Sequence, residues 1–336
     1  MSDHWLTLDV GERFKIALAV ARRRGRSFVE SHHNVVSVGA GFRLRGGENQ
    51  IVEDVCLCFF VSRKWSDRRT RPQKIPETVA AYVIVRGRRI RVRIPTDVSE
   101  LKGGRPHATL NLTEGITSRI NASPMDFASA CCLVRNAALP NERYLMSCYH
   151  AFSATLDRPP QNGIDCVSSS GTLVGTDVEA ADPNGSSALD AALVRVGDSS
   201  IQDMSVWGAT PVAHATDFDI DSLPLRGPLF ILGRRVAPAV DGLPQAVRME
   251  PIPASFRSLI TSPTSYDYGS TAGRSFVFAD TIEYKAAVRP GDSGSALVDT
   301  GGILYGMHFF GRGEFGYSLA APRLFEPGIF SLDIVI

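Results

Sequence analysis

The stretch Arg289-Pro290-Gly291-Asp292-Ser293-Gly294-Ser295-Ala296 decides how the rest of the chain is interpreted. A serine flanked by glycines and preceded by a proline disfavours a regular strand or helix. The pattern favours a tight loop that exposes one hydroxyl and turns backbone N–H groups toward a common point. Acyl transfer needs that geometry, because the charge of the tetrahedral intermediate must meet hydrogen-bond donors beside the nucleophile. Alone, Gly-Asp-Ser-Gly is also compatible with an ordinary turn.

A serine nucleophile needs a base, and the base needs an acid that orients it. His150 ends an apolar, strand-like run that begins at Tyr144, and Asp190 stands at the head of a second apolar run. The order along the chain is therefore His150, Asp190, Ser293. This is the order of the chymotrypsin-type proteases and differs from that of subtilisins and α/β-hydrolases.

The segments Leu-Met-Ser-Cys-Tyr-His (145–150), Asp-Ala-Ala-Leu (190–193) and Gly-Asp-Ser-Gly-Ser (291–295) resemble the His, Asp and Ser blocks of the trypsin/chymotrypsin superfamily. The residues of these segments are most similar to those of bacterial intracellular trypsin-like peptidases with an extra N-terminal domain. The resemblance implies a mainly β protein, a chymotrypsin-like double β-barrel preceded by a small α+β domain. It also implies a serine endopeptidase with the triad His150, Asp190 and Ser293 and an acyl-enzyme intermediate.

The resemblance assigns further site residues. The backbone N–H groups of Gly291 and Ser293 would form the oxyanion hole. Ala287, six residues before Ser293, would lie at the base of the primary pocket, where it offers no carboxylate to a substrate Lys or Arg. The segment 305–311 would form the pocket wall with His308, Phe309 and Phe310.

The specificity of that pocket stays open. His308 resembles the pocket histidine of viral 3C-type and glutamyl proteases, which cleave after Gln or Glu, since an imidazole can hydrogen-bond such a side chain. The alternative is a strand histidine packed against Phe309 or Phe310 in a pocket for apolar or aromatic groups. Among rivals for the triad, Asp182 is the second choice for the acid, whereas His214 follows Asp190 and is out of order.

Composition and charge place a domain boundary in the chain. Of 336 residues, 44% are hydrophobic and 21% are charged, which is typical of a globular protein. The formal net charge is +1, but residues 1–110 hold 21 Lys and Arg against 11 Asp and Glu, and residues 111–336 hold 15 against 24. We therefore expect a basic α+β regulatory or recruitment domain over residues 1–107 and the peptidase domain over residues 108–336.

The basic region has its own pattern. Residues 9–30 are typical of an amphipathic helix with Asp9 as N-cap, and strands are expected at 35–44, 51–61, 82–85 and 90–94. The basic run 22–26 is interpreted as a solvated helix end whose cations suit the helix dipole. Arg91 and Arg93 share one strand face, which favours either a phosphate-binding face or a charge-protected edge strand.

Several classes of protein are disfavoured. No signal peptide or membrane-spanning run is recognised, and the spacing of the six cysteines suggests neither local disulfides nor a zinc site, so we expect a reduced cytoplasmic protein without metal or cofactor. The expected partners are a protein or peptide substrate and a regulatory or acidic partner at the basic domain. A membrane is not expected, and nucleic acid is disfavoured but left open.

The sequence thus predicts a serine endopeptidase regulated by its N-terminal domain, with a bacterial stress or defence role as a hypothesis from resemblance. Two alternatives are a catalytically silent pseudoprotease that acts as a binding scaffold, and an esterase-type acyl hydrolase that uses the same residues.

Overall fold

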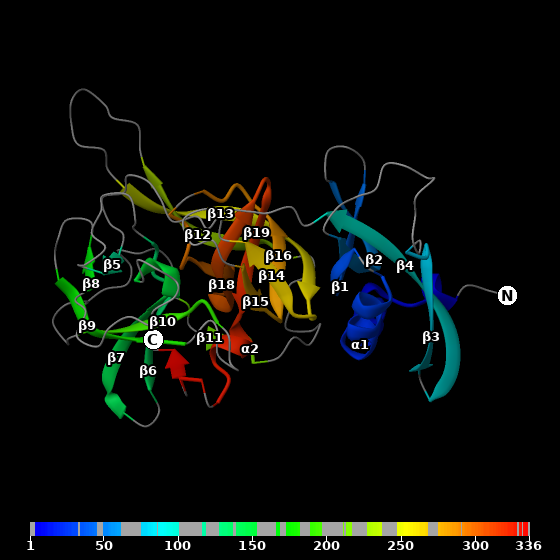
Figure 1. The fold of residues 1–336 in the computed structure, drawn as a ribbon, viewed down its shortest axis with the longest axis horizontal. Helices are drawn as coiled ribbons and strands as arrows, with labels where there is room; N and C mark the ends of the chain where they lie inside the picture. The colour runs from blue at the N-terminus through cyan, green and yellow to red at the C-terminus, as the bar shows by residue number, and fades with distance from the viewer. Residues whose placement is uncertain are drawn as a thin grey trace.

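A closed barrel of six strands lies at the centre of the molecule in the computed structural model (Figure 1). Each strand pairs with its neighbour in the order β12-β17-β18-β19-β16-β13, and β13 pairs back with β12. The strands are β12 (Leu229–Val236), β13 (Val247–Ile260), β16 (Thr281–Lys285), β17 (Ala296–Asp299), β18 (Ile303–Arg312) and β19 (Phe315–Ala320). A short strand, β11 (Ala213–His214), adds to β18 in parallel.

The structure describes residues 4–32, 34–45, 50–61, 75–85, 87–100, 116–118, 128–136, 139–152, 166–168, 173–181, 189–196, 211, 213–216, 227–236, 247–267, 275–289, 291–327, 329–330 and 332–334. Asp182 and residues 101–115, which include the predicted domain boundary, lie outside these residues. The predicted boundary at residue 107 therefore stays a prediction.

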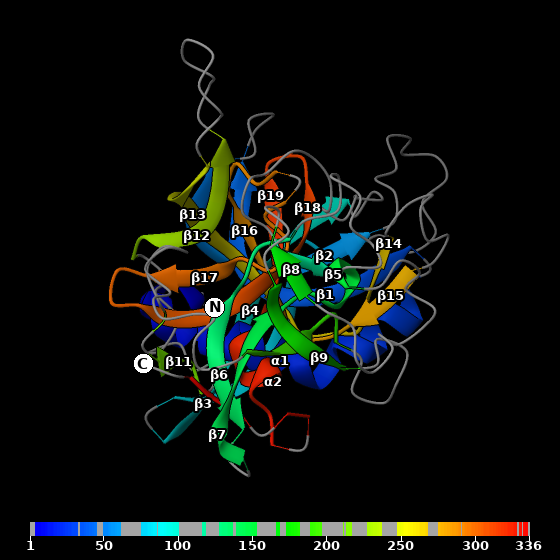
Figure 2. The ribbon, with the colours of Figure 1, turned by 90° about the vertical axis from the view of Figure 1, so that its left-hand side faces the viewer.

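A second sheet lies on one side of the closed barrel, as the green strands of Figures 1 and 2 show. Its order is β20-β6-β7-β10-β9-β8-β5. The strands are β5 (Ile116–Ser118), β6 (Cys132–Asn136), β7 (Leu139–Ser147), β8 (Cys166–Ser168), β9 (Leu173–Ala180), β10 (Ala192–Val196) and β20 (Leu332–Ile334). The last of these returns from the far end of the chain to pair with β6, so the sheet joins segments nearly 200 residues apart.

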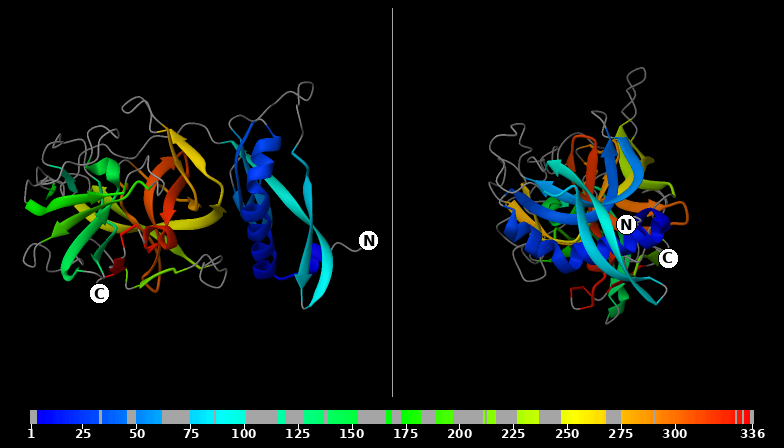
Figure 3. Two further views of the ribbon diagram at one scale, coloured as in Figure 1. Left: turned by 60° about the horizontal axis from the view of Figure 1, so that its bottom comes forward. Right: turned by 90° about the vertical axis from the view of Figure 1, so that its right-hand side faces the viewer.

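The N-terminal module, residues 4–100, lies on the other side of the closed barrel (Figure 1). It consists of η1 (His4–Thr7), α1 (Val10–Ser31), β1 (Val35–Arg45), β2 (Gln50–Val61), β3 (Thr78–Val85) and β4 (Arg88–Glu100). Strand β2 pairs antiparallel with β1 and parallel with the end of β4, and β3 forms a hairpin with the beginning of β4. Helix α1 lies across this layer (Figure 3).

Helix α1 begins where the sequence predicts. The Asp9 side chain accepts a hydrogen bond from the N–H of Glu12, and the Glu12 carboxylate accepts one from the N–H of Asp9. This reciprocal capping box satisfies two N–H groups that have no partner inside the helix. The helix continues to Ser31, so the basic run 22–26 lies before the last turn, and the dipole interpretation of these arginines is wrong.

The N-terminal module shares a sheet with the closed barrel. Residues 39–41 of β1 pair antiparallel with residues 258–260 of β13, which makes one continuous sheet from β12 to β3. Gly39 and Gly41 permit this pairing, because a Cβ at Gly41 would lie 2.5 Å from the Cβ of Ser258, and a Cβ at Gly39 would lie 3.1 Å from the Cα of Ile260. The module is thus joined to the barrel by backbone hydrogen bonds.

Smaller elements complete the fold. These are the 3-10 turn η4 (Tyr149–Ala151) between β7 and β8, the hairpin of β14 (Thr264–Asp267) and β15 (Ser275–Phe278) between β13 and β16, and helix α2 (Ala321–Leu324) between β19 and β20. Among the described residues, no helix is both long enough and apolar enough to cross a membrane. The architecture confirms the predicted class, a mainly β chymotrypsin-like fold preceded by a small α+β region.

Candidate active site

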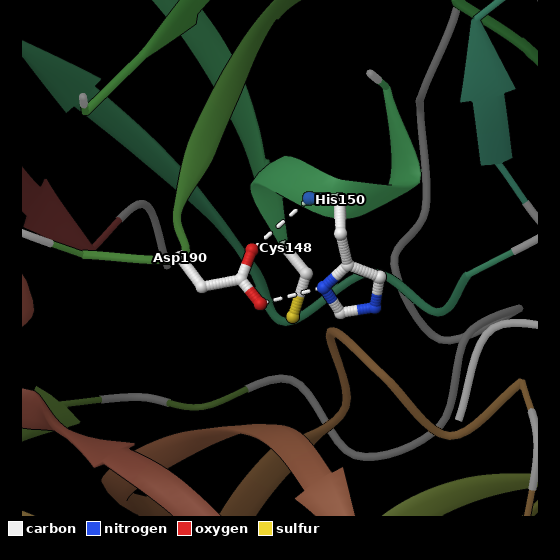
Figure 4. Close-up of side chains that lie close together, drawn as sticks. All are labelled: Cys148, His150 and Asp190. Atoms are coloured by element: carbon white, nitrogen blue, oxygen red, sulfur yellow. Dashed lines mark hydrogen bonds and ion pairs between the residues drawn. The ribbon is translucent and has the colours of Figure 1, made fainter. Parts of the chain in front are cut away.

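His150 and Asp190 meet at one end of the seven-stranded sheet. His150 lies in η4, directly after β7, and Asp190 lies two residues before β10, which pairs with β7. The Asp190 carboxylate accepts two hydrogen bonds from the same residue, one from the backbone N–H of His150 at 3.0 Å and one from its ring Nδ1 at 2.5 Å (Figure 4). Both side chains are nearly enclosed, with 4% and 3% exposure. Asp190 therefore fixes the orientation of the imidazole and favours the tautomer with a proton on Nδ1.

Ser293 comes from the closed barrel, in the loop between β16 and β17. Gly291 and Gly294 have φ values of 94° and 88°, in the region that favours glycine. The Asp292 carboxylate accepts a hydrogen bond from the N–H of Arg289 at 2.7 Å, and the Asp292 carbonyl accepts one from the N–H of Ser295 at 2.9 Å. Asp292 thus shapes the loop.

Two donors of this loop are available for an anionic oxygen. In the part of the chain that the structure describes, no hydrogen bond uses the N–H of Gly291 or of Ser293, whereas the intervening Asp292 N–H donates to the Arg289 carbonyl. Both residues are buried. An oxyanion hole requires donors that are not already used, so both N–H groups are available for the role that the sequence predicts.

The seven-stranded sheet also holds the nucleophile loop. The N–H of Ser129 donates to the Ser293 carbonyl at 2.7 Å, and the Ser129 hydroxyl donates to the Gly291 carbonyl at 2.8 Å. The Ser147 hydroxyl donates in turn to the Ser129 carbonyl at 2.6 Å. Gly294 allows this close approach, because a Cβ there would lie 3.0 Å from the Ser129 carbonyl carbon. Sequence reasoning missed the roles of both serines, since Ser129 belongs to no recognisable motif and Ser147 stands in the His block without a role assigned to it.

The structure brings His150 and Asp190 together, but Ser293 does not complete the chain of hydrogen bonds. The Ser293 hydroxyl is buried and has no hydrogen-bond partner among the described residues. Catalytic hydrogen bonds are often long in unliganded enzymes and shorten when substrate binds. The predicted assignment of the three residues as a triad therefore stays a proposal.

His308, the predicted pocket histidine, lies on β18 beside the nucleophile loop. Its carbonyl accepts a hydrogen bond from the N–H of Gly294, and its own N–H donates to the Ser295 carbonyl. Its Nδ1 lies 2.6 Å from the hydroxyl of Tyr284, which accepts a hydrogen bond from Ser318 at 3.3 Å. Because that hydroxyl already accepts a hydrogen bond from Ser318, its own proton is available for His308, which favours Nδ1 as the acceptor.

The other predicted pocket residues lie in different surroundings. Ala287 is exposed, directly before the nucleophile loop. Phe309 and Phe310 are buried and pack edge-on against the Tyr266 ring, with ring centroids 4.9 and 5.4 Å apart. A bulge in β18 at this position, opposite Ser318 and Tyr317, directs both rings into the barrel core.

The same end of the sheet contains the only group of possible metal ligands found among the described residues. Ligand atoms of Cys148, His150 and Asp190 lie within 4.8 Å of one another (Figure 4). However, the Cys148 thiol donates to the His308 carbonyl at 3.2 Å, and burial raises the pKa of this thiol well above its usual value. Because a metal needs the thiolate, this environment favours the His–Asp pair over a metal site. His214, a rival histidine, instead stacks on Phe325 with ring centroids 4.0 Å apart.

A histidine–aspartate pair on one sheet and a serine loop on a closed barrel define the class of double-barrel serine peptidases. The family model described as trypsin-like peptidase domain matches residues 130–307, and the chain belongs to this family of serine proteases. None of the curated proteins compared with the chain matches it.

Solved structures similar to the chain include the Rv3671c protease of M. tuberculosis. Its inactive form is 19% identical, with 63% of this chain and 84% of that chain covered and a TM-score of 0.36. Its active form is 20% identical, with 54% of this chain and 66% of that chain covered and a TM-score of 0.34. Similarity at this level carries no argument about the site.

Proposed function

We propose that the protein is an endopeptidase that hydrolyses peptide bonds of protein substrates with His150, Asp190 and Ser293 as its catalytic triad. The observation that carries the proposal is the pair of hydrogen bonds by which Asp190 holds both the backbone and the ring of His150. A purely structural pair would not need a fixed ring orientation next to a serine loop that has two available N–H donors.

The chemistry follows from the positions of these groups. The His150 Nε2, the ring nitrogen that Asp190 does not hold, removes the proton of the Ser293 hydroxyl as the oxygen attacks the scissile carbonyl. The imidazolium that forms is stabilised by Asp190 and then gives its proton to the leaving amine. Water attacks the acyl-enzyme by the same route, which regenerates Ser293.

The charge of each tetrahedral intermediate is received by the N–H groups of Gly291 and Ser293. Loss of one such donor typically costs about 2.7–4 kcal/mol of transition-state stabilisation. The contacts of Ser129 with the carbonyls of Gly291 and Ser293 support this role, because they restrict the peptide units of the loop from the segment before β6.

The proposed substrate has Gln or Glu before the scissile bond. The Tyr284 hydroxyl supports this choice, because its 2.6 Å hydrogen bond with His308 Nδ1 holds the imidazole in one orientation beside the nucleophile loop. Exposed Ala287 provides no carboxylate for a basic side chain. An apolar or aromatic preference, the alternative that the sequence left open, would be consistent with the aromatic packing of Phe309 and Phe310.

Control of the peptidase by its N-terminal module is part of the same proposal. The shared strand β13 supports it, since residues 258–260 contact β1 on one side and β16, the strand before the nucleophile loop, on the other. A stress or defence role stays a prediction that no described feature tests.

The test is labelling with a fluorophosphonate probe, which reacts with activated serines. Wild type should be labelled, and Ser293→Ala and His150→Ala should not. Ser295→Ala is the matched control, because Ser295 also has a buried hydroxyl without a partner in the described residues and lies in the same loop. It should keep its labelling.

A second measurement separates the alternatives. A peptide library with each residue before the scissile bond should show cleavage after Gln or Glu. Cleavage of small esters but of no peptide would favour an acyl hydrolase. Folded wild type that is neither labelled nor active, with or without polyanions added for the basic module, would favour a binding scaffold and contradict the proposal.

A further inference from the structure

The β3–β4 hairpin presents a charged face that the peptidase does not use. In β4, Arg89, Arg91 and Arg93 alternate with residues that face the core, and all three are exposed. The hairpin lies at the end of the molecule farthest from the seven-stranded sheet (Figure 1). One of its faces is turned away from the rest of the molecule (Figure 3). The opposite face carries Val79 and Val92, which are buried in the core of the N-terminal module.

Among the residues that the structure describes, the arginines of this face have no acidic partner. The sequence from residue 78 to residue 96 contains five arginines and no Asp or Glu. Among the described residues, no ion pair involves Arg89, Arg91 or Arg93, although other surface arginines are paired, such as Arg26 with Glu30 and Arg43 with Asp54. Like charges on one strand face repel one another, so an anionic ligand that bridges them would be stabilised.

Apolar side chains of β3 alternate with the arginines. The register places Tyr82 opposite Arg91 and Ile84 opposite Arg89, on the same outer face. Tyr82 is 63% exposed and Ile84 is 77% exposed, which makes them two of the five large hydrophobic side chains that are most exposed among the described residues. The alternative from the sequence, an edge strand that its charges protect from aggregation, gives no reason for these two apolar side chains to be exposed.

We propose that the outer face of the β3–β4 hairpin binds single-stranded nucleic acid. Arginines at alternate strand positions are spaced about 6.6–6.8 Å apart and contact successive phosphates. The Tyr82 ring, with the Arg89 guanidinium 4.8 Å from its centroid, forms a flat surface on which a base stacks. Positive charge together with an exposed aromatic ring is the combination by which such faces hold a single strand without reading its sequence.

This inference goes beyond the proposed peptidase function and does not depend on it. Arg24 of α1 extends the positive charge to the edge of the hairpin, because its guanidinium donates to the carbonyl of Ala80 at 3.1 Å. An acidic protein segment would satisfy the arginines but not the stacking surface, and an anionic membrane would need only the charge. These occupants are therefore distinguished by the contribution of Tyr82.

The experiment measures fluorescence anisotropy of a labelled single-stranded DNA of about 20 nucleotides, longer than the roughly 4–16 nucleotides that one OB fold covers. Wild type should bind, with log K falling linearly with log salt concentration. The triple variant Arg89→Gln/Arg91→Gln/Arg93→Gln should bind at least about tenfold more weakly. Its salt slope should be smaller by about 2, since each neutralised phosphate contributes about 0.7 for single strands.

Two further variants make the result specific. Tyr82→Ala should weaken binding at least about fivefold, because stacking of a base on an aromatic ring is lost. The variant Arg135→Gln/Arg143→Gln/Arg195→Gln removes the same charge from exposed strand positions of the seven-stranded sheet and should bind like wild type. Equal loss in this control would overturn the proposal, as would full affinity of Tyr82→Ala.

Competing polyanions test the other occupants. Poly-glutamate and vesicles of phosphatidylglycerol should displace the DNA only weakly. Binding of poly-glutamate that is tighter than binding of DNA would assign the face to an acidic protein segment, and tighter binding of the vesicles would assign it to a membrane surface. Either result would contradict the proposal, as would a wild type that binds no DNA at low salt.

Discussion

The Arg257 guanidinium of β13 donates a hydrogen bond to the Asp97 carboxylate of β4 at 2.7 Å, with the arginine side chain completely excluded from solvent. The same guanidinium donates to the sulfur of Cys58 on β2. Burial acts to raise the pKa of the Cys58 thiol, but the hydrogen bond from Cys56 and the charge of Arg257 outweigh it, so the pKa is lowered. One cation of the barrel is thus held by two strands of the N-terminal module.

This ion pair gives a first prediction about stability. Asp97→Asn should destabilise the protein by up to about 3–5 kcal/mol, because it removes the carboxylate that is hydrogen-bonded to the buried Arg257 and leaves the charge of buried Glu283 acting on it. Arg257→Met should cost less, since Asp97 is partly exposed and still accepts hydrogen bonds from the N–H groups of Leu44 and Val98. Urea unfolding of both variants and of the double variant measures the coupling. A double variant as unstable as the sum of the two single ones would disprove it.

Ser129 is expected to act on the rate of catalysis through the nucleophile loop. Ser129→Ala removes the hydrogen bond to the Gly291 carbonyl and should lower kcat about tenfold with KM nearly unchanged, because a displaced oxyanion donor acts on the transition state. Steady-state kinetics with a cleaved peptide provide the measurement. The control is Ser37→Ala, which removes a similarly buried serine hydroxyl, bonded to the Ser262 carbonyl, far from the loop in the fold. Equal effects on kcat in both variants would indicate a general structural role.

Tyr284 is expected to control specificity. Burial raises the pKa of the Tyr284 hydroxyl well above its usual value, so it stays protonated and donates to His308. Tyr284→Phe should lower kcat/KM for substrates with Gln before the scissile bond by about tenfold, the effect of one hydrogen bond. Substrates with an apolar residue there should be affected less, and Ser318→Ala, which keeps the tyrosine donor, should behave like wild type. A uniform loss over all substrates would count against a role in specificity.

Asp280 should make stability depend on pH. It has a φ of 52°, and burial raises the pKa of its carboxyl although the charges of Arg22 and Arg323 oppose the shift. A raised pKa means that the folded state holds the proton more tightly, so the contribution to stability is present at low pH and is lost as pH rises through the folded pKa. Asp280→Asn keeps a residue that tolerates positive φ and should raise Tm at pH 7, with the difference vanishing below about pH 4. An unchanged Tm from pH 4 to pH 7 in both proteins would contradict this.

The extent to which the sequence predicts the site depends on how local each signal is. His150, Asp190 and Ser293 stand in short motifs, because each needs particular neighbours to form its turn or strand end. The predicted helix and its cap were confirmed for the same reason, since the Asp9–Glu12 box is complete within four residues. Such motifs and helix caps can be predicted from residues that are adjacent in the sequence.

Other features arise only when distant segments meet. Gly39 and Gly41 have no local explanation in the sequence, and their reason is the backbone of β13 that lies against them. Ser129 acquires its role from a loop more than 160 residues away, through the carbonyls of Gly291 and Ser293. In the sequence, Arg257 fits the alternating pattern that an exposed cation on a strand would show. In the structure its side chain is buried, and β13 has a bulge opposite β16 at this position. No pattern of neighbours encodes these contacts.

The pairing of β1 with β13 also affects the order in which the chain folds. Gly39 and Ile260 are partners in the sheet but are 221 positions apart (260 − 39). During synthesis at about 5–20 residues per second, the exposed edge of β1 waits at least about ten seconds for its partner strand. Contacts of such long sequence separation slow folding and leave strand edges open to wrong partners. The nascent N-terminal module therefore exposes an unpaired strand edge until β13 has been synthesised.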